Sequence, residues 1–178
     1  MQDQVFFRPV RCKVNTVKNA APTKTIDAPI PSLAEVGLEG FAPYLMNRIM
    51  GRYNASVRDD LAAVDLTTPK MRILAVLSVE DGLMVNELSV FAVAEQSTMS
   101  RTLDQMEEAG WIQRRADEKD SRARRIYLTA AGRHRFEQIW PALSAAEARM
   151  FKGISPRDRA HFMATLITML HNIRVNPI

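Results

Sequence analysis

The side chains in this chain that are best suited to do chemistry form a short polar run at the start of one predicted helix. Hydroxyl, amide and guanidinium groups at the start of a helix can hydrogen-bond base edges in the major groove, and the helix N-terminus itself attracts phosphate. Met99, Leu103 and Met106 are spaced to turn the other side of the same helix toward a core. The polar members are Gln96, Ser97, Thr98, Ser100 and Arg101. The alternative is that the hydroxyl residues only cap the helix.

A second set of candidate contacts lies in residues 113–125, which hold six basic and three acidic side chains. Two short strand-like runs, 111–114 and 124–128, enclose a charged turn, a pattern typical of a hairpin. An arginine on an exposed hairpin can enter a narrow minor groove, and a nearby carboxylate can fix the direction of its guanidinium. The candidate residues are Lys119, Asp120, Arg122 and Arg124. The alternative is an ordinary solvated turn.

Other chemistries are not indicated. The sequence has no glycine-rich phosphate loop, zincin motif or nucleophile elbow, so we expect neither enzymatic activity nor a cofactor. The single cysteine, Cys12, excludes an intrachain disulfide and a cysteine zinc cluster. Basic residues on both sides of Cys12 would favour its thiolate, which leaves redox sensing as an alternative. We expect no metal site, because no histidine has a close ligand partner; the histidines are His134, His161 and His171.

Composition and charge favour a globular protein with basic appendages. The chain has 178 residues, a length that suits one domain or one domain with an appendage. The net charge of +4 is concentrated in residues 113–125 and in residues 1–36, which carry five basic and three acidic side chains. The longest apolar stretches, 73–79 and 162–170, are too short to cross a bilayer, and no signal-peptide apolar region follows the first residues. We therefore expect a cytoplasmic protein.

The elements that would hold the candidate residues are mostly helices. Residues 1–36 contain four of the nine prolines and predict an extended arm, with a possible short strand at 5–14. Apolar residues at steps of three or four predict one long helix over 38–66. Further helices are predicted after four residues that can act as N-caps: Thr68, Asn86, Thr129 and Ser155.

Three segments carry a specific resemblance. Residues 86–88 read Asn-Glu-Leu before the turn, and residues 96–112 hold the polar helix and the start of a strand. Residues 120–122 read Asp-Ser-Arg, and residues 128–132 read Leu-Thr-Ala-Ala-Gly. Taken together, these segments resemble the winged helix-turn-helix of the MarR family (multiple antibiotic resistance regulators). With the flanking helices, the similarity covers about residues 38–174.

The resemblance implies a mainly α fold with a small β-hairpin wing. It implies an arm at 1–36, a dimerisation helix at 38–66, a winged helix-turn-helix domain at 67–132 and C-terminal dimerisation helices at 133–176. It also implies an obligate homodimer whose two recognition helices are spaced for a pseudo-palindromic operator in double-stranded DNA.

The function implied by the resemblance is that of a transcriptional regulator, a repressor released by a small aromatic or lipophilic effector. Asp120 would orient an arginine, and Arg122 would enter the minor groove. The residues implied to contact the major groove are Ser97, Thr98, Ser100 and Arg101. Two features depart from the family pattern: Glu95 stands where Ser or Asp often caps the recognition helix, and the arm is longer than usual. The alternative function is a winged-helix module that binds protein, against which the basic hairpin argues.

Candidate effector contacts are weaker. Met46, Met50 and Tyr53 lie on the predicted long helix, and methionine adapts to irregular pockets. Ordinary packing in a dimer core is the simpler interpretation of these three residues.

Overall fold

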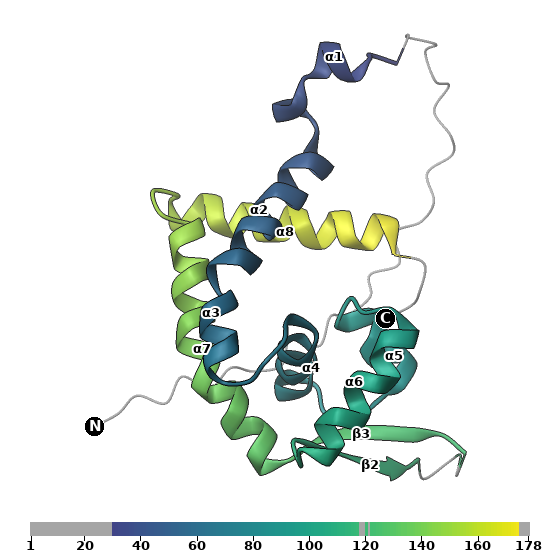
Figure 1. Cartoon of the computed structure of the whole chain (residues 1–178). Coiled ribbons are helices and arrows are strands. Elements are labelled where there is room, and N and C mark those ends of the chain that lie inside the picture. Colours follow the sequence, from purple (N-terminus) through teal and green to yellow (C-terminus); the bar gives the residue numbers. More distant parts are fainter. Residues whose placement is uncertain (1–29, 118–119, 121, 175–178) are drawn as a thin grey trace.

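The computed structural model describes residues 30–117, 120 and 122–174. Most of the proline-containing arm, including Cys12 and the possible strand at 5–14, lies outside the described residues, as does Lys119. The described part is mainly helical with a small antiparallel sheet, and the mainly α fold class is confirmed. In Figure 1 the strands lie at one end of the molecule, and α2 leads away from them toward the N-terminal helices.

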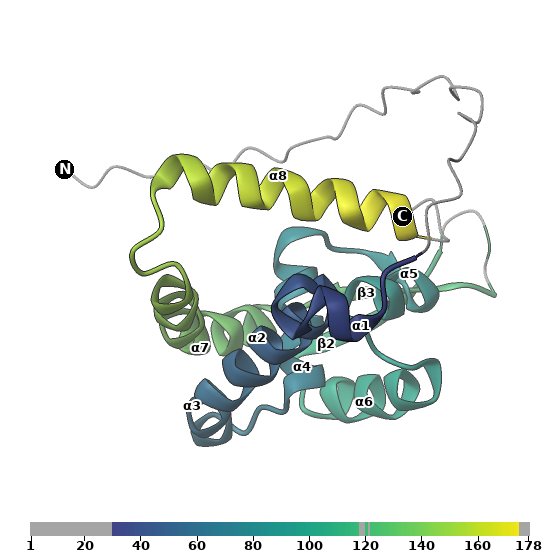
Figure 2. The same cartoon turned by 90° about the horizontal axis from the view of Figure 1, so that it is seen from above.

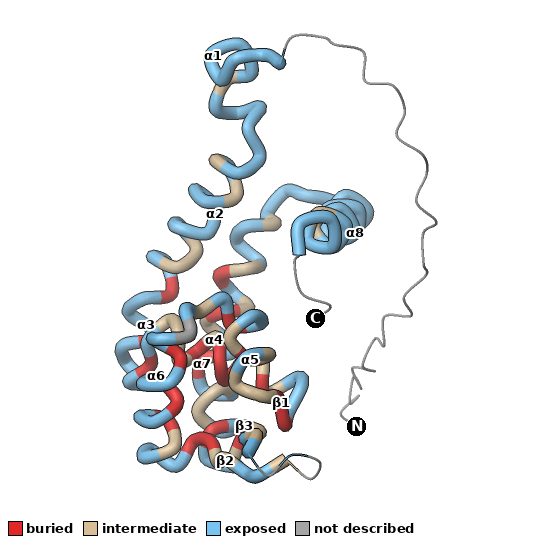
Figure 3. Tube along the Cα trace, turned by 90° about the vertical axis from the view of Figure 1, so that its right-hand side faces the viewer, coloured by how far each residue is buried: buried red, intermediate tan, exposed pale blue. Residues whose placement is uncertain are grey.

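Three short helices surround the centre of the core. They are α4 (Thr68–Val79), α5 (Val85–Phe91) and α6 (Gln96–Glu108). The apolar stripe predicted for the polar helix is confirmed, since its three members are fully buried, and Figure 3 shows buried positions gathered where these helices meet the sheet. The largest fully buried side chains of these helices are Ile73, Leu74, Leu77, Leu88, Met99, Leu103 and Met106.

The predicted hairpin is present but has a third strand. β2 (Ile112–Ala116) pairs with β3 (Arg124–Leu128), and β1 (Leu83–Met84) pairs with the other edge of β3, so the order is β1-β3-β2 and all pairs are antiparallel. Ile126, which is opposite both Leu83 and Arg114, is fully buried. The central strand therefore anchors the sheet to the core, while the outer ends of β2 and β3 project as the wing.

The prediction of one continuous helix over 38–66 is wrong. The structure has α1 (Leu33–Val36), η1 (Leu38–Gly40), α2 (Ala42–Ser56) and α3 (Arg58–Ala63). The break falls at Val57, whose φ of −109° and ψ of 3° leave the helical range while its side chain is fully buried. Burial of Val57 and Leu61 in the core fixes α3 against the body, and the break lets α2 leave at its own angle (Figure 1).

Two long helices end the described chain. α7 (Ala130–Met150) packs on α4 and α2 and buries Ile139, Leu143 and Ala146, and α8 (Pro156–Ile173) follows after a tight turn. None of the residues in α8 is buried, and Figures 1 and 2 show this helix lying apart from the sheet and the short helices. α8 thus exposes both of its sides in the single chain.

Two of the four predicted helix caps are confirmed and two are displaced. The hydroxyls of Thr129 and Ser155 accept first-turn amides of α7 and α8. The cap of α4 is Thr67 rather than Thr68. α5 begins after Met84, two residues before the predicted cap Asn86, because the Glu87 carboxylate reaches back to accept the Met84 amide at 2.8 Å.

The glycine of the Leu-Thr-x-x-Gly motif is required by packing. The Thr129 amide donates to the Trp111 carbonyl at 3.0 Å, which draws the start of α7 against the chain leading into β2. A Cβ on Gly132 would stand 2.1 Å from that carbonyl oxygen, far inside contact distance. Only glycine allows this approach of two backbones.

We expect Gly132→Ala to lower the free energy of unfolding by about 2 kcal/mol or more, because the methyl group meets backbone rather than a movable side chain. Urea unfolding at fixed protein concentration measures the loss. Gly51→Ala is the matched control, since a Cβ there meets nothing within 4 Å and alanine is the better helix former. Equal stability of the two variants would contradict this account of the motif.

Candidate nucleic-acid interface

The outer face of α6 presents the predicted polar residues to solvent. Ser97, Thr98, Ser100 and Arg101 are all exposed, while the apolar residues of the same helix face the core. Gln96 is the first residue of α6. The hydroxyls do not cap the helix: the N-cap is Glu95, whose side chain makes no capping hydrogen bond. The alternative in which these residues serve only as caps is therefore wrong.

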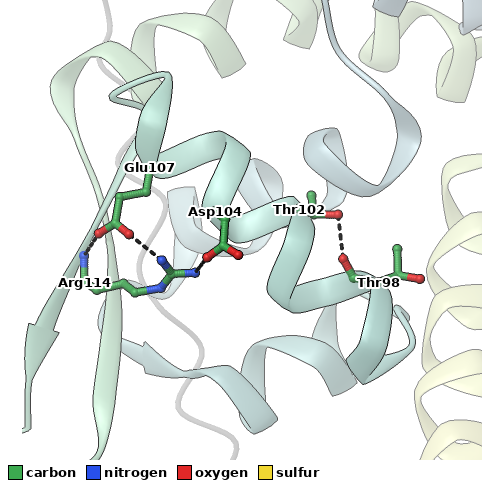
Figure 4. Close-up of polar contacts among 5 residues, drawn as sticks. All are labelled: Thr98, Thr102, Asp104, Glu107 and Arg114. Carbon is green, nitrogen blue, oxygen red and sulfur yellow. Dashed lines mark hydrogen bonds and ion pairs between the residues drawn. The ribbon is translucent and has the colours of Figure 1, made fainter.

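Thr102 was not singled out from the sequence, and the structure gives it a different task. Its side chain is 9% exposed, and its hydroxyl donates to the Thr98 carbonyl at 2.8 Å (Figure 4). This bond to the preceding turn uses the Thr102 hydroxyl as a donor within the helix itself. Thr102 is therefore not part of the exposed polar face formed by Ser97, Thr98, Ser100 and Arg101.

The wing tip is held by carboxylates that bind backbone. Asp120 Oδ1 accepts the Arg122 amide at 2.9 Å, and Asp117 Oδ1 accepts the Asp120 amide at 3.0 Å. These bonds are those of a tight turn closed by aspartates. In the described contacts Asp120 therefore shapes the turn from which the Arg122 side chain emerges, exposed to solvent. Arg124, on the adjoining strand, is also exposed.

Part of the positive charge of residues 113–125 is engaged inside the wing. The Arg125 guanidinium pairs with Asp117 and donates to the Gly82 carbonyl at 2.8 Å, which ties β3 to the turn before β1. The bond to Asp117 also raises the pKa of Arg125. The Arg115 guanidinium lies 4.6 Å from the centre of the Tyr127 ring, a cation–π distance.

Arg114 is engaged as well, and with α6. Its Nη2 lies 2.7 Å from Asp104 Oδ1, its Nη1 donates to Glu107 Oε2, and its own amide donates to Glu107 Oε1 at 3.0 Å (Figure 4). Asp104 and Glu107 lie one turn apart on α6 and so share one side of that helix. In the structure they form, with Arg114, the bridge between α6 and the wing, which we call the acid–arginine bridge.

A separate cavity of about 670 Å³ lies where α2, the end of α7 and the start of α8 meet. Of the three candidate effector contacts, Tyr53 lines this cavity, whereas Met46 and Met50 are not among its lining residues. Burial raises the pKa of Tyr53, with a further contribution from Glu147, so the phenol is a neutral donor at pH 7. Three arginines contribute to the otherwise mostly apolar lining: Arg48, Arg52 and Arg149.

Neither a metal cluster nor a membrane span is found in the described part of the chain. Within residues 30–117, 120 and 122–174, no group of three His, Cys, Asp or Glu side chains is placed to hold an ion. His134 instead contacts Gln138 at 3.3 Å. No described helix combines the length and the apolar character needed to cross a bilayer.

Comparison with known proteins relates this chain to one family of regulators. Residues 66–123 match the model of the MarR family. The chain is 26% identical over 143 residues to the transcriptional repressor IacR of Pseudomonas putida, which covers 80% of this chain and 86% of IacR.

Solved structures of MarR family proteins are also similar to this chain. A MarR family transcriptional regulator from Silicibacter pomeroyi is 53% identical, with a TM-score of 0.79 over 83% of this chain and 100% of that one. A Mycobacterium tuberculosis MarR family protein in complex with p-aminosalicylic acid is 26% identical, with a TM-score of 0.59 over 72% of this chain and 98% of that one.

Proposed function

The chain belongs to the MarR family of transcriptional regulators, and from this we propose that it binds a pseudo-palindromic DNA operator as a homodimer and represses transcription until a small molecule releases it. The observation that carries the proposal is the exposed polar face of α6 beside a wing whose tip presents Arg122. Proteins of this family are transcriptional regulators rather than enzymes. The similarity of this chain to the transcriptional repressor IacR supports repression rather than activation.

In this proposal α6 enters the major groove by its first turns. Ser97, Thr98 and Ser100 are short donors and acceptors, and Arg101 has the reach and fork geometry to hold a guanine. Arg122, on the wing, enters the flanking minor groove, and Arg124 contacts the phosphate backbone nearby. Gln96, which begins α6, and Lys119 belong to the same proposed contact set. Asp120 supports the proposal by holding the turn at Arg122.

The homodimer is supported by apolar surface that the single chain leaves uncovered. One face of α8 is lined by Phe162, Met163, Ile167, Leu170 and Ile173, which are between 42% and 77% exposed. α1, η1 and α2 add a second set, also apolar and exposed: Leu33, Val36, Leu38, Phe41, Leu45 and Ile49. Contiguous apolar surface of this kind marks a protein interface.

The effector site proposed is the cavity between α2, α7 and α8. Its apolar lining suits the body of a small aromatic or lipophilic molecule, and Arg52 beside Tyr53 suits an acidic group on that molecule. A family relative in complex with p-aminosalicylic acid supports an aromatic acid as the ligand type. Because α2 and α8 both carry the proposed dimer surface, a ligand there would alter the spacing of the two recognition helices.

We expect Arg122→Ala to weaken binding to DNA selected from a random pool by about tenfold or more at fixed salt, because an arginine contact in a narrow groove is lost. Titration by fluorescence anisotropy measures the change. Arg101→Ala is the comparison: it should also change the sequence preference in a repeated selection, whereas loss of a phosphate contact weakens all sequences alike. Unchanged affinity for Arg122→Ala would contradict the wing assignment.

The wild-type protein should sediment at micromolar concentration as a species of twice the 20.1 kDa chain mass. Ile167→Glu should shift it to the single-chain mass, because a charge cannot be buried in the apolar face of α8. Thr168→Glu, an exposed polar position about 100° around α8 from Ile167 and outside its apolar face, should leave the assembly intact. A folded monomer of wild-type protein would contradict the proposal.

Salicylate, used as a probe aromatic acid, should bind the wild-type protein and release it from DNA. Arg52→Gln should weaken that binding by about tenfold, since a charge-assisted hydrogen bond is removed from the cavity. Calorimetry measures binding, and Arg58→Gln, which lies on α3 outside the cavity lining, is the control. Equal loss in both variants would mean that the arginine acts through net charge and not as a cavity contact.

A further inference from the structure

The acid–arginine bridge joins the recognition helix to the wing through three contacts. Asp104 and Glu107 are three residues apart on α6 and therefore share one side of the helix. Both carboxylates converge on the Arg114 guanidinium, and Glu107 also takes the Arg114 amide (Figure 4). A guanidinium can hold two carboxylates at once in a fixed fork, which an ammonium group cannot do.

The bridge stands at the base of the wing. Side chains alternate along a strand, so Arg114 shares its face with Ile112, which is 2% exposed and packed in the core. Arg114 is paired with Ile126, the last fully buried position of β3 in this direction. The next residues of β2, Arg115 and Ala116, are exposed. Beyond Arg114, β2 is held by its pairing with β3, and β3 in turn is tied at Arg125 to Gly82 and β1 rather than to buried apolar side chains.

The acid–arginine bridge adds little to the free energy of unfolding, but its contacts fix the direction of the Arg114 side chain relative to α6. The side chains of Asp104 and Glu107 are 67% and 37% exposed, and solvent screens ion pairs of this kind. Removing the bridge should therefore cost little stability. It would, however, release the strand at the point about which the wing can swing relative to α6.

We propose that Arg114 is a positioning residue: held by Asp104 and Glu107, it sets the angle between α6 and the wing so that the two reach adjacent grooves together. This inference rests on the proposed function, because it concerns how the two DNA-contacting elements are aligned. Arg114 itself is turned toward α6 and is not one of the DNA contacts. The two acids near the DNA surface serve to hold it.

The test uses a double variant, Asp104→Asn with Glu107→Gln, in the full chain. It removes two negative charges beside the DNA, so simple electrostatics predicts tighter binding. Positioning predicts the opposite sign: affinity for selected DNA falls by about tenfold, with wing protection lost from the hydroxyl-radical footprint and the base preference of α6 retained. Glu108→Gln, on the same helix and outside the bridge, is the control and should bind no more weakly than wild type.

Arg114→Lys separates positioning from a direct phosphate contact. The ammonium group keeps the charge and would keep a phosphate contact, but it cannot hold both carboxylates, so wing protection should be lost. Amide exchange in the free protein adds a readout without DNA: the double variant should exchange faster at residues 114–116 while its thermal unfolding stays close to that of wild type.

The outcomes are distinct. Tighter or unchanged DNA binding by the double variant, or an intact wing footprint in Arg114→Lys, overturns the positioning role while leaving the DNA-binding function standing. If the wild-type protein selects no DNA sequence, the proposed function fails. In that case unchanged exchange at residues 114–116 in the double variant would overturn the bridge as a restraint on the wing as well.

Discussion

The arrangement of this chain depends on one backbone junction, at Trp111. The Trp111 amide donates to the Met106 carbonyl near the end of α6. The Trp111 carbonyl accepts the amide of Thr129, the N-cap of α7. The indole ring lies between two cations, with Lys70 from α4 and Arg135 from α7 both within 5.4 Å of the ring centre. Four elements thus meet at one nearly buried residue. The helix that leads to the proposed dimer surface and the helix proposed to read DNA therefore share a fixed point.

The sequence predicted well those elements that depend on local rules. The stripe at Met99, Leu103 and Met106, the hairpin, and the caps Thr129 and Ser155 follow from periodicity and capping, and all are present in the structure. Features decided by tertiary packing were missed. A helical period continues through Val57, yet burial of that side chain breaks the helix. The sequence allows a brief strand at residues 83–85, which the structure has as β1, but the pairing of β1 with the edge of β3 does not follow from the sequence.

In the candidate site, too, the sequence predicted what depends on local spacing and missed what depends on tertiary contacts. Residue types and spacing identified the polar face of α6, and the structure exposes it. A count of charges could not tell which cations face outward, because that depends on which acids fold back on them. Arg114 and Arg125 are held by carboxylates seven to ten positions away in the chain, and both pairs of Arg114 join α6 to β2. The net positive charge of residues 113–125 is therefore partly neutralised within the wing, while Arg122 near its tip stays exposed.

The turn between α5 and α6 contains a valine in an unfavourable conformation. Val93 has a φ of 51°, in the left-handed region that β-branched residues rarely adopt, and its side chain is 76% exposed. A residue in such a conformation costs on the order of 1 kcal/mol, which the packing of the two flanking helices must overcome. Glycine would adopt this backbone conformation without strain. For protein engineering, this turn is a position at which the helix pair could be relaxed and made more robust while every proposed DNA-contacting side chain is left unchanged.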